Sequence, residues 1–413
     1  MAYENREEWF QRFGVSIGSG GEYPHVARGV VVIELWNFDF TRYYLYHREE
    51  QTRANVESGF LLYAEDSTLY VRREEDGSVL LFEGAESSRV YCERMRWGMY
   101  EVVSVKNDRR KSVRLVGKSA ESDRVATLYV PENGQAFSLT GETFVEGNVY
   151  LPRNGVSYTQ VRSEFFRGKP LEKEQIKVSD SDFPTLDAES REVVESLFAG
   201  TGEREWLDNG GVLECAFDAP VTRAEVGEYL SGVRVKGHIV LYAPEMLFVE
   251  QDVRLDGVIL VGQRVEFADG FSGCVQVFAR DSILLGDGVC LKAGSGLHLW
   301  REGEKGGLVR FGEHCEVNGY VIVKADADDG ERKRAVYVQP ESSRVRGLVF
   351  VDGIAEVHGM VTGSLFARGC YYFAPEGYYA GILYNAVLPG NPGLAYPLLM
   401  EGPYERRTVK WLD

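Results

Sequence analysis

Three aspartates in the C-terminal half, Asp326, Asp328 and Asp329, come nearest to the residue types and spacing of a metal site. Carboxylate oxygens are the ligands that Ca²⁺ prefers, and three of them in one loop could share an ion. In the register of an EF-hand loop, however, Gly330 comes one position too early and Tyr337 takes the place of the bidentate glutamate. The pattern favours a solvated turn, and we expect no bound metal or other cofactor.

The histidines and cysteines do not form a second candidate. No H-x-x-x-H, H-E-x-x-H or C-x-x-C spacing occurs, which argues against zinc, and buried single thiols are favoured although disulfide pairing in a periplasm stays open. His314 and Cys315 could form a nucleophile pair, but neighbouring residues usually point apart. The six histidines are His25, His47, His238, His298, His314 and His358; His238 and His298 lie inside repeat strands, where a structural or simple surface role is favoured.

Charge and the missing motifs exclude several classes of function. The chain has 46 Lys and Arg against 63 Asp and Glu, a formal net charge of −17, so a nucleic-acid backbone would be repelled. No phosphate-binding loop, G-x-S-x-G elbow or dinucleotide fingerprint is present. No catalytic residue is therefore assigned, although a glycan lyase, whose Lys, Arg and Asp residues meet only in three dimensions, would leave no local motif.

A sequence repeat in the C-terminal half predicts the strands that would position any functional site. The pattern apolar-x-Gly-x-apolar-x-apolar recurs at steps of about 16 to 25 residues, which is typical of a β-solenoid. A second register spaces Leu247, Val265 and Ile283 equally. We expect a right-handed parallel β-helix, because no hexapeptide rhythm is present, with a β-sandwich as the alternative. The copies are VKGHIVL, LDGVILV, FSGCVQV, VNGYVIV, VRGLVFV and VTGSLFA, with glycines Gly237, Gly257, Gly273, Gly319, Gly347 and Gly363; VEGNVYL at 145 is an outlier and GSGLHLW at 294 a weak copy.

The chain is expected to be mainly β, with a small α+β domain before the solenoid. A helix is predicted from Arg42 to about Tyr63, followed by an antiparallel meander, and a second helix from about Asp187 to before Gly200. The predicted divisions are 1–41, a leader or arm; 42–135, the α+β domain; 136–232, a connector with an acidic segment; 233–368, the solenoid; and 369–413, a C-terminal cap.

Several segments in this order resemble uncharacterised envelope-associated proteins of Bacteroidota whose genes tend to lie among pseudopilin-like genes. The segments are ANVESGFLLY, ERMRWGMYEVVSV, GETFVEGNVYLPRNGV, IVLYAPEMLFVEQDVRLDGVILVGQRVEF, SSRVRGLVFVDGIAEVHGMVTGSLFA and VKWLD. The resemblance implies a pilin-like N-terminal domain, a β-solenoid, protein partners in an envelope assembly and a location in the cell envelope or periplasm. Relatives look membrane-anchored, but GVVVIELWNFDFTRYYLY stands at the anchor position here, so no transmembrane segment is expected in this chain.

Two functions follow from these expectations. The first is a non-enzymatic structural or assembly protein of the bacterial cell envelope, associated with a pseudopilin-like filament or secretion apparatus. The alternative is a polysaccharide-binding or polysaccharide-cleaving β-helix protein with a groove near the loops 300–307 and 324–334, where Lys324 and Arg332 would join the aspartates. Two tyrosine groups could stack on sugars or a partner, although packing is favoured: Tyr43, Tyr44 and Tyr46, and Tyr371, Tyr372, Tyr378 and Tyr379.

Overall fold

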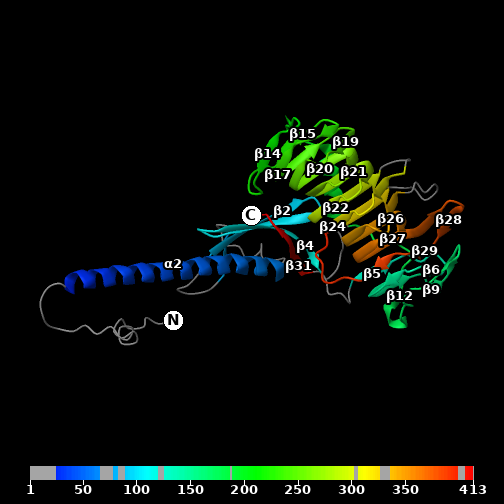
Figure 1. Cartoon of the computed structure of the whole chain (residues 1–413), viewed down its shortest axis with the longest axis horizontal. Coiled ribbons are helices and arrows are strands. Elements are labelled where there is room, and N and C mark those ends of the chain that lie inside the picture. The colour runs from blue at the N-terminus through cyan, green and yellow to red at the C-terminus, as the bar shows by residue number, and fades with distance from the viewer. Residues whose placement is uncertain are drawn as a thin grey trace. The chain divides into compact units, whose positions relative to one another are not determined.

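The computed structural model describes residues 25–65, 78–81, 89–119, 125–186, 188–301, 306–325, 335–398 and 405–412. The described chain is mainly β with parallel-strand sheets, which confirms the predicted class (Figure 1). By its contacts the chain divides into two compact units, Met1–Asn55 and Val56–Asp413. Helix α2 (His25–Glu65) contributes residues to both units.

Helix α2 contains the helix predicted over 42–63 and begins earlier, at His25, within the segment 1–41 for which a leader or arm was expected. No proline interrupts these 41 residues. Neither of the α-helices that the structure describes is long and apolar enough to cross a membrane. In the first unit the side chains of Tyr43, Leu45 and Tyr46 are more than half exposed.

The second unit opens with an antiparallel sheet, against which the last turns of α2 pack. Its strands, in spatial order, are β1 (Ser78–Leu80), β2 (Arg89–Trp97), β3 (Tyr100–Lys106), β4 (Lys111–Ser119) and β31 (Glu405–Trp411). Val56, Phe60 and Tyr63 of the helix share one core with Val90 and Val103 of the sheet. The helix and meander are thus confirmed, but the C-terminal strand was wrongly assigned to a cap because its partner β4 is far away in sequence.

The repeat forms a stack of parallel strands, called here the parallel stack. Each strand pairs with the next copy, and Gly319, Gly347 and Gly363 lie side by side in register, so the antiparallel β-sandwich alternative is wrong for this region. Leu247, Val265 and Ile283 are in register as predicted. The long strands are β20 (Arg254–Phe267), β21 (Ser272–Leu285), β22 (Cys290–Arg301), β24 (Glu316–Ala325), β26 (Arg344–Val357) and β27 (Met360–Ala374).

Long strands bend where their register shifts, so one strand can serve two faces of the stack. Strands β21 and β26 do this, each pairing on a second face with β23 (Leu308–Phe311) or β25 (Val336–Gln339). The pairings β21–β22–β24–β26–β25–β23 therefore close into a ring. The ring is a closed parallel arrangement around an apolar interior.

The parallel stack begins earlier than the predicted boundary at 233. Strand β14 pairs in parallel with β17, and β15 with β18, so residues from Glu205 onward belong to the stack and not to a connector. Their polar, acidic composition concealed these short strands. They are β13 (Glu205–Trp206), β14 (Val212–Cys215), β15 (Thr222–Glu225), β16 (Tyr229–Leu230), β17 (Arg234–Gly237), β18 (Ile239–Tyr242) and β19 (Met246–Val249).

The other end of the stack is built from residues that precede it in sequence. Leu365 of β27 pairs with Leu128 of β5 (Ala126–Tyr129), Leu128 pairs with Val149 of β8 (Asn148–Leu151), and Val149 pairs with Ile176 of β12 (Ile176–Val178). The segment 125–130, at the end of the predicted α+β domain 42–135, therefore belongs to the stack, as does the outlier VEGNVYL. Around these strands lie β6 (Phe137–Thr140), β7 (Phe144–Val145), β9 (Val156–Tyr158), β10 (Gln160–Val161), β11 (Glu164–Phe165), the 3₁₀ helix η2 (Lys173–Gln175), β28 (Gly377–Ala380), β29 (Ile382–Tyr384) and β30 (Val387–Leu388).

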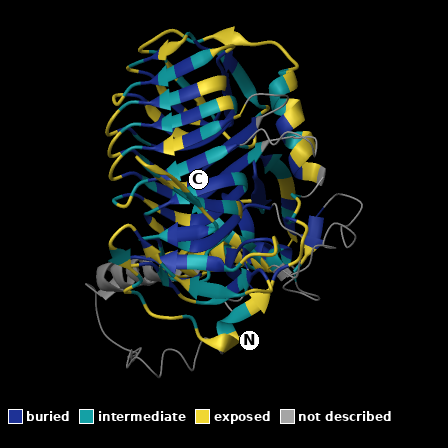
Figure 2. Ribbon diagram, turned by 90° about the vertical axis from the view of Figure 1, so that its right-hand side faces the viewer, coloured by how far each residue is buried: buried dark blue, intermediate teal, exposed yellow. Residues whose placement is uncertain are grey.

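Two apolar layers follow from the strand alternation. Side chains that point inward form a continuous interior core along the stack. Side chains that point outward from one face form a second cluster, covered by the antiparallel sheet and by α3 (Ala188–Ala199), the predicted second helix. The guanidinium of Arg280 lies 4.2 Å from the ring of Phe198 on α3, and that of Arg191 on α3 lies 5.5 Å from Trp300. Figure 2 shows the stacked strands with buried and exposed residues alternating along them.

Candidate functional site

The tip of the β2–β3 hairpin is joined to the side of the parallel stack by a buried glutamine. The Gln276 Oε1 atom accepts hydrogen bonds from the backbone N–H of Met99 and from the Tyr320 hydroxyl, both at 2.9 Å, and its Nε2 donates to the carbonyl of Trp97 at 2.9 Å. The Trp97 indole N–H donates to the carbonyl of Gly257 at 2.8 Å. These bonds hold the antiparallel sheet and the stack together.

The repeat glycines lie where the chain passes closest to its neighbours. A Cβ atom built on Gly319 or Gly347 would lie 1.8 Å from the carbonyl oxygen of the preceding strand, and both have positive φ. The hydroxyl of Tyr100 lies beside Gly319 and that of Tyr396 beside Gly363. In the weak copy at 294 the register puts Ser295, not Gly296, opposite Gly319.

A polar cluster secures α2 to the antiparallel sheet. The Tyr63 hydroxyl donates a hydrogen bond to Glu101, whose carboxylate also lies 3.8 Å from Arg94 and 3.5 Å from Arg406. Nearby, Arg114 is buried, forms an ion pair with Glu57 of the helix and lies 3.8 Å from the ring of Phe60. The helix is thus held by charge-assisted bonds in addition to apolar packing.

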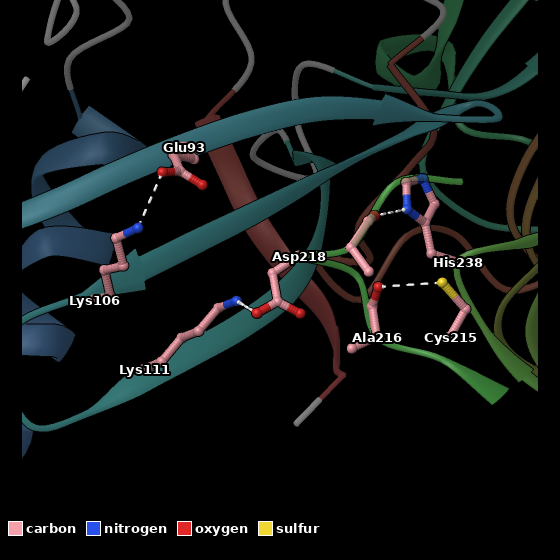
Figure 3. Close-up of polar contacts among 8 residues, drawn as sticks. Glu93, Lys106, Lys111, Cys215, Ala216, Asp218 and His238 are labelled. Atoms are coloured by element: carbon pink, nitrogen blue, oxygen red, sulfur yellow. Dashed lines mark hydrogen bonds and ion pairs between the residues drawn. The ribbon is translucent and has the colours of Figure 1, made fainter. Parts of the chain in front are cut away.

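An open groove of about 600 Å³ lies between the edge formed by β4 and β31 and the first strands of the stack. Figure 3 shows how Lys111 reaches Asp218 across it, with Nζ and Oδ2 2.5 Å apart. This bond lowers the pKa of the Asp218 carboxyl. Lys410 pairs with Asp256 in the same groove. These two ion pairs join the sheet to the stack across the groove, which Glu214, Cys215 and Lys236 also line.

Two other groups in Figure 3 have structural partners. The Cys215 thiol lies 3.6 Å from the carbonyl of Ala216, and the His238 Nδ1 lies 2.8 Å from that of Ala219. Burial lowers the pKa of His238, whose ring packs against Trp97 and Phe217. The expected structural role of His238 therefore has a physical basis in the docking of the hairpin.

The predicted metal candidates Asp326, Asp328 and Asp329 lie outside the described residues, as does Arg332. Lys324 is described, and its Nζ lies 4.7 Å from the ring of the buried Trp300. In the part of the chain that the structure describes, no three His, Cys, Asp or Glu residues are placed to share a metal ion. Of the loops 300–307 and 324–334 the structure describes only residues 300–301, 306–307 and 324–325.

His314 and Cys315 do not form a nucleophile pair. His314 is exposed, whereas Cys315 points into the interior core, where its thiol donates to the carbonyl of Gly286 at 3.1 Å. Burial raises the pKa of the Cys315 thiol, which keeps it protonated and unreactive. All six cysteines are free.

His298 occupies an unusual position under α3. It is 1% exposed, stacks between Phe278 and Trp300, and has no hydrogen-bond partner at either ring nitrogen among the described residues. Burial, with Lys324 and Arg280 nearby, lowers its pKa to about 3. The ring is therefore neutral and behaves as an aromatic packing residue that is costly to bury.

The C-terminal tyrosines gather on the hairpin formed by β27 and β28. Tyr372 stacks on Tyr379 and Tyr384, while Tyr378 is exposed beside Phe373. Arg162 binds Glu376 at the hairpin tip with two hydrogen bonds of 2.6 and 2.7 Å. Packing accounts for Tyr371, Tyr372 and Tyr379, as expected, whereas Tyr378 contacts Tyr371 and Phe373 but stays 66% exposed.

Sequence reasoning missed Gln276 and Trp97, because each looks like an ordinary residue of a β-strand. The one available signal was a glutamine within the apolar copy FSGCVQV. Comparison with models of protein families, with curated proteins and with solved structures finds no match to this chain.

Proposed function

We propose that this chain is a non-enzymatic structural or assembly protein, in which a pilin-like helix and sheet carry a β-solenoid of the right-handed parallel β-helix class. In this proposal helix α2 recruits the chain to a pseudopilin-like filament or secretion apparatus of the bacterial cell envelope. The solenoid then serves as a rigid body that the filament or apparatus displays.

The joint at Gln276 is the observation that carries this proposal. A buried side chain with three hydrogen bonds, 2% exposed, joins hairpin and stack in a way that an independent, hinged domain would not need. Such a joint transmits orientation from the sheet to the stack. It supports a mechanical role more directly than a catalytic one.

The helix supports the recruiting role. Between Arg42 and Asn55 it carries apolar or aromatic side chains that remain exposed, among them Tyr43, Leu45 and Tyr46. Exposed apolar positions on a long helix are a usual means of binding another helix. In the groove between β31 and the stack, the ion pairs Lys111–Asp218 and Lys410–Asp256 join the sheet to the stack, which supports a structural role.

A photo-crosslinking amino acid at position 46 tests the proposal in the full-length chain, expressed together with its pseudopilin-like partners. A covalent adduct with such a partner is expected at Tyr46 and not at Tyr378, an equally exposed tyrosine on the C-terminal hairpin. Equal labelling at both positions, or no adduct with a pilin-like protein, would refute the proposal.

A further inference from the structure

We propose that the parallel stack associates head to tail with a second copy of this chain, the free edge of β13 in one copy pairing with the free edge of β12 in the next. The inference rests on the proposed assembly function and names a partner for it. It is argued from strand edges, exposed side chains, register and charge at the two ends of the stack.

Both ends of the stack present strands with a partner on one side. Among the described residues, β13 pairs with β15 alone, β14 with β17 alone, and β16 with β19 alone. At the opposite end β12 pairs with β8 alone. Figure 1 shows β14 and β12 at opposite ends of the stack. An unpaired strand edge is a template for pairing with another chain.

The β13 end exposes apolar side chains that such pairing would cover. Trp206, Val212 and Tyr229 are at least half exposed, with exposed fractions of 59%, 64% and 50%. Leu207 and Leu213 pack against the interior core but remain partly exposed. The interior of the stack is therefore not closed by described residues at this end.

The β12 end is partly covered. Phe166 and Leu171, from the segment that contains β10, β11 and η2, pack against the interior core there. Strand β12 itself remains open, and Val178 is 60% exposed although it shares the side of Leu151, an interior residue. Strand β12 is thus one open edge at this end, where β7 and β9 also pair on one side only among the described residues.

The register of the two edge strands matches. Lys177 of β12 pairs with Tyr150, and its Nζ lies 5.4 Å from the Tyr150 ring. Trp206 of β13 pairs with Glu225, and Glu225 pairs with Tyr242, which belongs to the outer apolar cluster together with Tyr150. Trp206 therefore lies on the same outer side of the stack as Lys177. One more parallel step would place Lys177 beside Trp206, where a second cation–π contact can form.

The two ends differ in charge. Residues 203–218 carry five carboxylates and one arginine, whereas residues 160–178 carry five basic side chains and three carboxylates. Two β13 ends would repel each other, so charge favours the head-to-tail arrangement over a head-to-head dimer. A head-to-tail contact does not close on itself and gives chains of copies.

Glu205 limits the strength of this contact. It pairs with Ala224, an interior residue, so its carboxylate is on the inward side of the edge strand. Inward charges on edge strands disfavour pairing. We therefore expect association that grows with protein concentration, and stronger association once this charge is removed.

Sedimentation velocity of the full-length chain over a concentration series is the test. Wild type is expected to show a rising sedimentation coefficient, Glu205→Gln to reach the same state at about tenfold lower concentration, and Trp206→Lys and Val178→Lys each to require at least about tenfold more protein. Tyr378→Lys, on neither edge strand, should behave as wild type.

Mixing the two defective variants is the decisive step. Trp206→Lys keeps an intact β12 end and Val178→Lys an intact β13 end, so the mixture should form dimers and nothing larger. The inference is overturned if wild type and Glu205→Gln both stay monomeric, if neither end variant weakens association, or if Trp206→Lys alone does so. The cross-link at position 46 tests helix α2 and not the ends of the stack. A negative result in sedimentation would therefore leave the proposed function to be tested separately by the cross-link.

Discussion

The side-chain oxygen of Gln276 accepts a hydrogen bond from the backbone N–H of Met99, a residue 177 positions away in sequence. The same amide bonds Trp97 and Tyr320, so one side chain satisfies three buried groups from two parts of the chain. Removing it leaves those groups without partners, and the cost of burying them unpaired exceeds the value of the bonds themselves.

Gln276→Leu should therefore lower the free energy of unfolding by about 3 kcal/mol, because three buried polar groups lose their partner at about 1 kcal/mol or more each. Urea unfolding followed by tryptophan fluorescence measures the change. Gln263→Leu, at an exposed position in the next strand back, is the matched control and should change little. An equal effect in both variants would contradict the role given to Gln276.

Gly347→Ala should prevent folding or cost more than about 4 kcal/mol, since the new Cβ would overlap the carbonyl oxygen of Gly319 and the φ of 145° is unfavourable for alanine. Gly377 has nearly the same φ, 151°, but open space around it. Gly377→Ala should cost only about 1 kcal/mol, for the backbone strain alone. Thermal unfolding of both variants separates strain from overlap, and similar melting temperatures would show that close approach is unimportant.

His298 should make the chain less stable in mild acid. Its pKa is lowered to about 3 in the fold, with burial as the main cause, whereas an unfolded histidine has a pKa near 6.5. Between these values the unfolded chain binds a proton that the fold excludes, so this contribution to stability falls as pH decreases, by up to about 1.4 kcal/mol per pH unit. Above about pH 7 the contribution of His298 to the free energy of unfolding no longer changes with pH.

His298→Phe keeps an aromatic ring between Phe278 and Trp300 and should remove this pH dependence. Unfolding free energies at pH 7 and pH 5 measure it. His314→Asn is the control, because His314 is exposed with a φ of 58°, which asparagine tolerates. An unchanged difference between the two pH values in His298→Phe would contradict the assignment.

Tyr63→Phe should loosen the end of α2 by about 2 kcal/mol, because the hydroxyl donates to the buried, charged Glu101. Hydrogen exchange of the amides between Val56 and Glu65 is the measurement, and faster exchange confined to this segment and its sheet is expected. Tyr378→Phe, at an exposed tyrosine, should leave the exchange unchanged. Uniform acceleration over the whole chain would instead indicate global destabilisation.

The repeat predicted the parallel stacking because each copy contains alternating apolar residues, which point inward, and a glycine at a tight corner. The register of Leu247 with Val265 follows from equal spacing, and that of Gly319 with Gly347 from the matching pattern of their two copies. The second helix was predictable because Gly200 ends it just after Ala199. These features depend on residues that are close together in sequence, so short sequence patterns are enough to predict them.

Contacts over long sequence distances could not be predicted. The pairing of Leu365 with Leu128 and of Trp411 with Arg114 joins strands whose own sequences carry no mark of the partner. The acidic first strands of the stack lack the repeat's apolar letters and were taken for a connector. In the sequence Gln276 differs from its neighbours only by being polar. Its role as a buried amide can be recognised only once the structure shows the β2–β3 hairpin packed against it.

The order of strands in the parallel stack limits how its length can change. Strand β27 is followed in space by β5, β8 and β12, all of which precede it in sequence; Ser364 of β27 and Ala126, at the start of β5, are 238 positions apart. A further copy of the repeat added after β27 would have to separate β27 from β5. A unit added or lost before β27 would leave these pairings intact, so a stack with this strand order can change its length within the run of repeats but not at the β27 end.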